Sequence, residues 1–136
     1  MYLKIKGFGM SHFYLEAFEH VYKEKVAEYE EISRITDQKV RDTEPGMLIH
    51  TQTLVEATVE KNVYRWLEVY RSYEDLEMHL KNPCVEEHIE KLNKGFLCAP
   101  LDVTFYCDWD DEQKKPWLAV EGLKLQFAEL VNGYYK

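Results

Sequence analysis

Residues 64–83 read YRWLEVYRSYEDLEMHLKNP, and the spacing of the large side chains changes halfway along this stretch. From residue 63 to residue 70, large side chains alternate over both faces of a period-two pattern, which predicts a β-strand. Ser72 is followed three positions later by Asp75, and a serine N-cap with acidic residues in the first turn predicts the start of a helix. Pro83 interrupts that helix. The stretch therefore predicts a strand that passes directly into a helix.

The residues before this stretch predict a strand, a long helix and a second strand. Residues 12–21 alternate in the manner of a strand, and residues 23–40 carry apolar side chains three and four apart amid Glu and Lys, as in an amphipathic helix. Pro45 and Gly46 end the helix. Residues 47–56 are rich in β-branched side chains and form a predicted hairpin with residues 63–70, with a loose turn around Lys61 and Asn62.

The residues after Pro83 predict the rest of one layered domain. A helical pattern resumes with Val85, Ile89 and Leu92 and stops near Gly95, and residues 101–109 alternate as a fourth strand. The order strand, helix, strand, strand, helix, strand is that of the ferredoxin-like α+β fold, with an antiparallel sheet.

One domain over residues 1–136 is expected, with a core at about 12–109 and a C-terminal arm at 110–136. Two helices cover one face of a four-stranded sheet, but both faces of these strands carry large side chains, so a second copy of the sheet is the expected cover of the other face. The arm is too apolar to be disordered. It predicts an added strand, or an arm on the partner subunit.

Charge and composition narrow the range of partners. The net charge of −8 disfavours binding to nucleic acid or to an anionic membrane surface, because both carry phosphate. Ten tyrosines and three tryptophans suit a stacked organic ligand or an oligomer interface. The sequence therefore favours a small-molecule or protein partner.

The remaining composition indicates a reduced, cytoplasmic protein. Three cysteines without a C-x-x-C pair favour neither a disulfide framework nor a structural metal site. Residues 1–9 alternate Lys with apolar residues and lack the continuous apolar run of a signal peptide, and no stretch is long enough to span a membrane.

Familiar catalytic motifs are missing from the sequence, including the glycine-rich nucleotide loops, H-E-x-x-H and G-x-S-x-G. No cofactor and no metal are therefore expected, and no two of the five histidines have metal-ligand spacing on one element. His79 borders the apolar stripe of its helix, where it could accept a proton or orient a phenolic substrate. The alternative is a hydrogen-bonded boundary histidine, and His88 has the same two interpretations.

Two strands carry polar groups that could reach a ligand. His50 and Gln52 share a face with Leu48 and Leu54, so they are either the hydrogen-bonding groups of an apolar pocket or a cross-strand polar pair. On the next strand, side chains from residues 64–70 place a carboxylate among aromatic rings, a pattern that fits a binding pocket or a subunit interface equally well: Tyr64, Trp66, Glu68 and Tyr70.

The motifs in residues 44–51 and 64–83 resemble the antibiotic biosynthesis monooxygenase domain over about residues 12–109. The shared features are the Glu44-Pro-Gly turn, an aromatic and a Glu on the following hairpin, and a His-Leu pair before Asn-Pro at the end of the next helix. The resemblance implies a homodimer whose sheets face each other as a dimeric α+β barrel. It also implies an enzyme without flavin or metal that oxidises a quinol or phenolic aromatic with molecular oxygen.

Residue by residue, the resemblance implies His79 as the catalytic residue, with Trp66 and Glu68 in the substrate pocket. His50, Tyr64 and Tyr106 are added as candidate substrate-binding residues on the strand-face argument alone. Two other functions stay open: a dimeric module that binds an aromatic metabolite without reaction, and, less favoured, a haem-degrading oxygenase, since His88 is out of register with the expected haem ligand.

Overall fold

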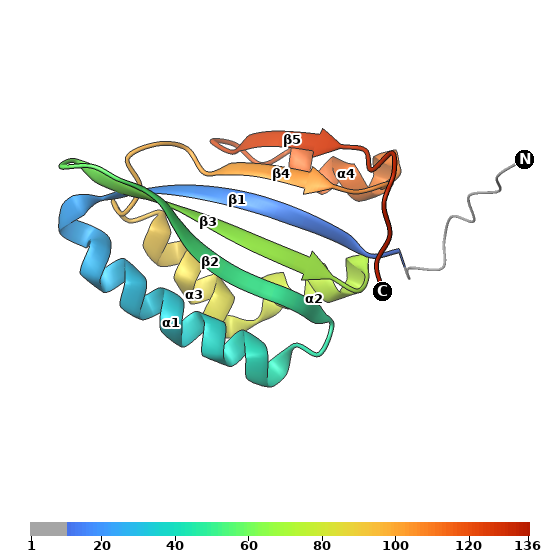
Figure 1. The fold of residues 1–136 in the computed structure, drawn as a ribbon, viewed down its shortest axis with the longest axis horizontal. Coiled ribbons are helices and arrows are strands. Elements are labelled where there is room, and N and C mark those ends of the chain that lie inside the picture. The colour runs from blue at the N-terminus through green and yellow to red at the C-terminus, as the bar shows by residue number, and fades with distance from the viewer. Residues whose placement is uncertain (1–10) are drawn as a thin grey trace, which may run out of the picture.

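The computed structural model describes residues 11–136, and the prediction made for residues 1–9 lies outside them. Figure 1 shows a twisted sheet with α1, α2 and α3 beneath it. The elements are, in chain order, β1 (Phe13–Tyr22), η1 (Lys23–Lys25), α1 (Val26–Thr43), β2 (Met47–Ala57), β3 (Lys61–Tyr70), α2 (Tyr73–Lys81), α3 (Pro83–Leu92), β4 (Asp102–Tyr106), α4 (Asp111–Leu118) and β5 (Lys124–Ala128).

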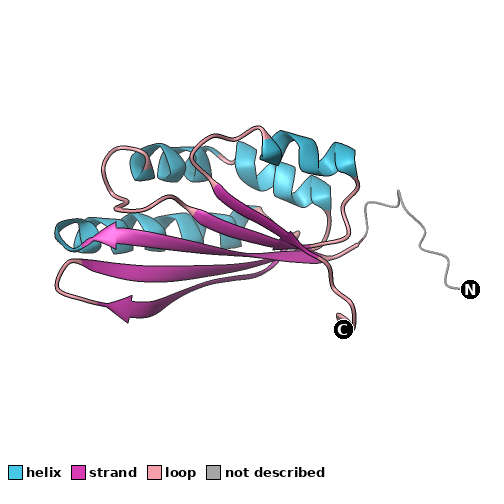
Figure 2. Cartoon of the chain, turned by 90° about the horizontal axis from the view of Figure 1, so that it is seen from above, coloured by secondary structure: helices cyan, strands magenta, loops and turns pink. Residues whose placement is uncertain are grey.

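The first eight of these elements confirm the predicted ferredoxin-like α+β fold. The sheet has the strand order β2-β3-β1-β4-β5, with antiparallel pairing of β1 to β3, β1 to β4 and β2 to β3. Figure 2 shows the long strands running side by side across the molecule. Within the described chain, no helix is long and apolar enough to cross a membrane.

One local prediction was wrong: the turn between β2 and β3 does not lie at Lys61 and Asn62. Both residues already belong to β3. The turn lies just before them and is closed by a 2.8 Å hydrogen bond from the Thr58 amide to the Lys61 carbonyl. The Thr58 hydroxyl also accepts a hydrogen bond from the Lys61 amide at 3.1 Å. A threonine side chain therefore holds the backbone of this turn.

The broken second helix forms as the sequence predicts. The Ser72 side chain accepts a hydrogen bond from the amide of Asp75 and starts α2. Asn82 then ends α2 and starts α3, since its side chain accepts from the amide of Cys84, and Pro83 occupies the first turn of α3. This joint turns the two helices so that His79 and His88 both face the sheet.

The C-terminal extension adds a helix and a strand to the sheet of its own chain. Asp110 starts α4 with a full capping box, and β5 pairs with β4 in parallel. Trp117 of α4 lies against Phe105 of β4, with ring centroids 4.7 Å apart. The predicted added strand is thus present on this chain, and a contact of the arm with a partner subunit stays a prediction.

The inner face of the sheet carries the core, and the outer face is partly open. Inward-facing side chains of β1, β3 and β4 form one buried aromatic cluster, in which the rings of Phe13 and Tyr70 stack 5.1 Å apart. On the outer face, Ile49 of β2 is nearly half exposed. That exposed face is where the sequence predicts a second copy of the sheet; the dimer stays a prediction.

Candidate functional site

A cavity of about 150 Å³ lies between the inner face of the sheet and helices α2, α3 and α4. This is the size of an engineered apolar cavity that holds a benzene molecule, so the space accommodates about one aromatic ring. Its walls are mostly apolar, with the side chains of Leu15, Ala17, Leu76, Leu80, Val85, Ile89, Leu101, Val103, Phe105 and Trp117. The few polar groups that reach the cavity therefore determine how it can bind a ligand or react with it.

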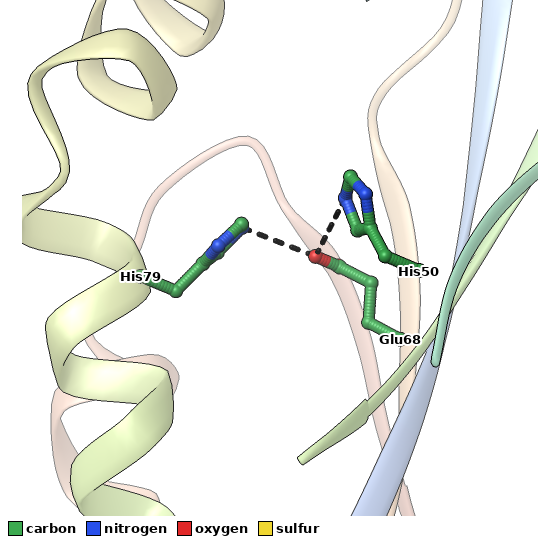
Figure 3. Close-up of side chains that lie close together, drawn as sticks. All are labelled: His50, Glu68 and His79. Atoms are coloured by element: carbon green, nitrogen blue, oxygen red, sulfur yellow. Dashed lines mark ion pairs between the residues drawn. The ribbon is translucent and has the colours of Figure 1, made fainter. Parts of the chain in front are cut away.

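The main polar group of the cavity is a cluster of His50, Glu68 and His79, drawn in Figure 3. The three residues come from β2, β3 and α2, and all three side chains are largely buried. The Nε2 atom of His79 lies 3.1 Å from Oε1 of Glu68, and Nε2 of His50 lies 3.8 Å from the same oxygen. Tyr70 donates a hydrogen bond to this oxygen as well, at 3.1 Å.

Each histidine of the cluster is held from behind by a second carboxylate. The Nδ1 atom of His79 donates to Oε1 of Glu44 at 2.8 Å, and Nδ1 of His50 donates to Oδ1 of Asp37 at 2.8 Å. Both rings therefore present Nε2 to Glu68, and their orientations are fixed by hydrogen bonds to charged groups. The Asn82 amide donates to the other oxygen of Glu44 at 2.8 Å.

Charge in this cluster favours a protonated His79 and an ionised Glu68. Burial alone lowers the pKa of His79, but the negative charges of Glu68 and Glu44 and the hydrogen bonds to them outweigh burial and raise it to about 10. Burial likewise acts to raise the pKa of Glu68, and the charge and hydrogen bond of His79 outweigh it, so that its pKa is lowered. Near neutral pH His79 is a fixed positive charge.

The Glu44-Pro45-Gly46 turn positions Glu44 at the end of α1. The Glu44 amide ends the helix with a hydrogen bond to the Val40 carbonyl, and the Gly46 carbonyl accepts from the amide of Arg71, next to the end of β3. A Cβ atom on Gly46 would lie only 1.9 Å from Oδ1 of Asp75. Glycine is needed here for close approach, and the turn thereby brings Glu44 to α2.

A second buried carboxylate, Glu19 of β1, lines the same cavity. Its Oε1 atom accepts hydrogen bonds from the Tyr29 hydroxyl and, at 2.8 Å, from Nε1 of Trp66. Burial raises the pKa of Glu19 to about 7; the two hydrogen bonds oppose that rise, and the charge of Glu68 adds to it. Glu19 is therefore the carboxyl group in the cavity whose pKa matches proton transfer near neutral pH.

His88 of α3 also reaches the cavity, next to Thr36 of α1. Its Nδ1 atom lies 3.3 Å from the Thr36 hydroxyl. Burial lowers the pKa of His88 to about 4, so this imidazole is neutral at physiological pH. Two histidines nine positions apart, which an unbroken helix would separate, thus face one space in different charge states.

Four of the six predicted site residues meet at the cavity: His50, Trp66, Glu68 and His79. The ring of Trp66 stacks on that of His50, with centroids 4.6 Å apart. Trp66 therefore contacts His50 with the face of its indole ring and Glu19 with its indole N–H.

Tyr64 and Tyr106 lie elsewhere. Tyr64 faces inward but packs on Tyr29 at the α1 end of the sheet, where its hydroxyl donates to Glu30. Tyr106 lies on the outer face, where it stacks on Tyr14 at 4.5 Å and donates to Glu16 at 2.7 Å. Phe105 faces inward, so the alternation of β4 turns Tyr106 away from the cavity.

Three acidic residues of the site, Glu19, Asp37 and Glu44, were not among the predicted site residues. Glu19 alternates with Leu15 and Ala17 on the inward face of β1. A charged residue on the apolar face of a strand could therefore have been recognised in the sequence. Asp37 carried no such signal, and Glu44 stood out only as part of the Glu44-Pro-Gly turn, because both residues reach the histidines through tertiary packing. No two histidines have metal-ligand spacing on one element, but the potential ligand atoms of His50, Glu68 and His79 come from three elements and lie within 4.8 Å of one another.

Comparison with known proteins identifies the fold. No family model and no curated protein matches the chain. Among solved structures, a candidate antibiotic biosynthesis monooxygenase from Caulobacter crescentus aligns with a TM-score of 0.64 at 22% identity, over 75% of this chain and 93% of that one. The chain has the fold of the antibiotic biosynthesis monooxygenases.

Two further structures with this fold are informative. MupZ from Pseudomonas fluorescens aligns over 92% of this chain and 93% of its own, with a TM-score of 0.63 at 18% identity. SnoaB from Streptomyces nogalater, a cofactor-independent oxygenase solved as a mutant, aligns over 73% of this chain and 94% of its own, with a TM-score of 0.56 at 16% identity. At these identities the monooxygenase likeness is one of fold.

Proposed function

We propose that the protein is a monooxygenase that oxidises a small electron-rich phenol or quinol with molecular oxygen and without a bound cofactor. The observation that carries the proposal is the apolar cavity, about the size of one ring. It holds a positively charged His79 and a carboxyl group, on Glu19, whose pKa is about 7. The fold shared with a cofactor-independent oxygenase agrees with it.

The reaction balances without an external reductant. A quinol with a free ring carbon takes up one O2 and gives a hydroxyquinone and water. A phenol with a free para carbon likewise takes up one O2: one oxygen atom enters the ring as the second carbonyl of a quinone, and the other leaves as water. The two hydrogens of that water come from the phenol hydroxyl and the para carbon, and the substrate supplies all four electrons. The protein has to remove the hydroxyl proton and shield the resulting anion from water.

Glu19 is the proposed proton acceptor, and His79 supplies charge. Both ring nitrogens of His79 donate to carboxylates, so the protonated imidazole has no free lone pair to accept a proton. Its positive charge offsets part of the negative charge of Glu68 and Glu44, which would otherwise repel a phenolate in a partly desolvated cavity. A Glu19 pKa of about 7 lets that carboxyl group accept a proton and release it again near neutral pH.

The size of the cavity favours a single-ring substrate. A space of about 150 Å³ suits one benzene-sized ring against Trp66, and the four pyrrole rings of a haem would not fit in it. This argues against the haem-degrading alternative. Trp66 is the proposed wall for the substrate ring, because its position is fixed by the stack on His50 and the hydrogen bond to Glu19.

A homodimer is part of the proposal. Apolar side chains of β2 are nearly half exposed, among them Ile49 on the outer face and Val55 at a register shift. A second copy of the sheet would bury them and remove that surface from water.

Oxygen uptake by the purified, metal-stripped protein tests the activity, with single-ring quinols compared with naphthols. Uptake above the autoxidation blank should be lost in Glu19→Gln and reduced strongly in His79→Ala, while His12→Ala, at a histidine that does not line the cavity, should match the parent protein. Wild-type uptake that persists in Glu19→Gln would overturn the role of Glu19.

A binding module is the second candidate function. The observation in its favour is that the nitrogens of His79 are already satisfied by Glu44 and Glu68, as in a purely structural network. Quenching of tryptophan fluorescence by a phenol, with no oxygen uptake above the blank, would establish this alternative in place of the oxygenase.

A further inference from the structure

We infer that His50, Glu68 and His79 form a binding site for a divalent first-row transition-metal ion. Their potential ligand atoms come from three different elements and lie within 4.8 Å of one another. Two imidazoles and one carboxylate on one side of an ion form a ligand set that suits such ions and leaves positions open for other ligands. The inference rests on this geometry and does not depend on the proposed oxygenase activity.

The carboxylates that hold the two histidines give the strongest support for a metal site. Nδ1 of His50 is held by Asp37 and Nδ1 of His79 by Glu44, both at 2.8 Å, so each ring presents Nε2 to Glu68. A metal-bound histidine characteristically gives its other N–H to a carboxylate or carbonyl, which fixes the ring and makes the ligand nitrogen more basic. This arrangement occurs twice here, on both histidines of the same cluster.

Charge supports the same conclusion. Three carboxylates, of Asp37, Glu44 and Glu68, converge on two imidazoles in a largely buried space. A divalent cation in this space would offset two of the three negative charges. The ion would take the place of the proton between His79 and Glu68.

The distances define the movement that binding requires. Ligand atoms about 2.1 Å from one ion lie roughly 3.0 to 3.4 Å apart. The His79–Glu68 pair, at 3.1 Å, already has that separation, whereas His50 at 3.8 Å has to move inward. His50 lies on the edge strand β2, so the movement needs no rearrangement of the central strands.

The ion would lie at the wall of the one-ring cavity. All three proposed ligands line that space, which is otherwise mostly apolar. A ligand with two adjacent oxygen atoms on a small ring, such as a catecholate, could fill the open positions while its ring lies against the apolar wall. This is the chemical class that the site would take with the ion in place.

Isothermal titration of the EDTA-treated, untagged full chain with Zn²⁺ tests the inference, without substrate. One ion per chain is expected, with Asp37→Asn and Glu44→Gln each weakening binding about 10-fold to 100-fold. His79→Ala should abolish the binding, and His12→Ala should leave it unchanged. Titration with Co²⁺ should give visible ligand-field bands that are lost in Glu68→Gln.

Two results would overturn the inference. The first is Zn²⁺ binding that is equal in the parent protein and in the His50→Ala and His79→Ala variants. The second is the absence of any change in the His50 and His79 ring signals when the wild-type protein is titrated with Zn²⁺ in an NMR experiment, a readout that needs no variant to fold. Because neither experiment involves a substrate or oxygen, failure here is distinct from failure of the oxygenase proposal.

Discussion

Nδ1 of His79 lies 2.8 Å from Oε1 of Glu44, a residue 35 positions earlier in the chain. This contact joins the C-terminal end of α1 to α2 and fixes the ring that faces Glu68. Both side chains are more than nine-tenths buried. The pair therefore links the stability of the fold to the geometry of the cavity.

Replacement of Glu44 by Gln should lower the free energy of unfolding by about 2 kcal/mol, because it removes a buried charge-assisted hydrogen bond and leaves the positive His79 with one carboxylate fewer. Urea unfolding followed by circular dichroism measures the change. Glu31→Gln is the matched control, since the Glu31–Arg34 pair is exposed and its loss should not be measurable. Equal unfolding curves for Glu44→Gln and the parent protein would contradict the assignment.

Glu19 predicts a specific dependence of stability on pH. Its folded-state pKa of about 7 lies above the unfolded value of 4.5, so its contribution is fully present below pH 4.5 and is lost as pH rises through 7. Between these limits the parent protein should lose about 3 kcal/mol that Glu19→Gln does not lose, from roughly 1.4 kcal/mol per pKa unit. The measurement is urea unfolding of both proteins at several pH values.

The control for this experiment is Glu24→Gln, at an exposed position, which should follow the parent profile. His88 contributes with the opposite sign, since its folded pKa of about 4 makes stability fall as pH drops from 6.5. Comparison of each variant with the parent isolates Glu19, because His88 is common to all three proteins. A constant difference between Glu19→Gln and the parent across this range would refute the prediction.

Trp117→Ala should open the cavity toward α4. The indole ring lines the cavity and packs on Phe105, so its removal should cost about 1–3 kcal/mol and admit bicyclic phenols that the parent excludes. Fluorescence titration with a phenol and a naphthol measures the change in selectivity. Leu118→Ala, at a neighbouring exposed position, should change neither quantity. Unchanged preference for the single ring in Trp117→Ala would show that α4 does not set the size limit.

The proposed dimer can be tested on its outer face. Ile49→Lys places a charge in the middle of the proposed interface and should convert a dimer into a monomer, as measured by light scattering at micromolar concentration. Val59→Lys is the control, because Val59 is 92% exposed in the turn after β2. A parent protein that is already monomeric would remove the dimer from the proposal.

Alternation along the strands predicted much of the cavity wall. Trp66 and Glu68 share the inward phase of β3, and His50 lies opposite Glu68 in the register with β2, so a pattern of period two was enough to bring these residues to one face. The same reasoning could not place Tyr106 without knowing that Phe105 points inward. Register and phase are properties of the assembled sheet, and a single strand does not fix them.

The carboxylates behind the two histidines were beyond sequence reasoning. Asp37 and Glu44 are polar residues in and just after a helix whose other acidic side chains are mostly exposed, and only the packing of α1 against β2 and α2 brings these two to the histidines. The parallel strand β5 was likewise missed as a partner of β4, because an apolar tail does not reveal which edge it joins. Long-range contacts of this kind depend on tertiary structure.

The register of β2 shifts twice, once between Met47 and Ile49 and once between Leu54 and Glu56. β2 is also the outermost strand at its end of the sheet, and a long edge strand presents unpaired backbone groups to any extended chain that approaches it. Irregular spacing along such an edge interrupts the row of donors and acceptors on which an added strand would have to align. We therefore expect these two irregularities to protect the protein from growing edge to edge into amyloid-like aggregates.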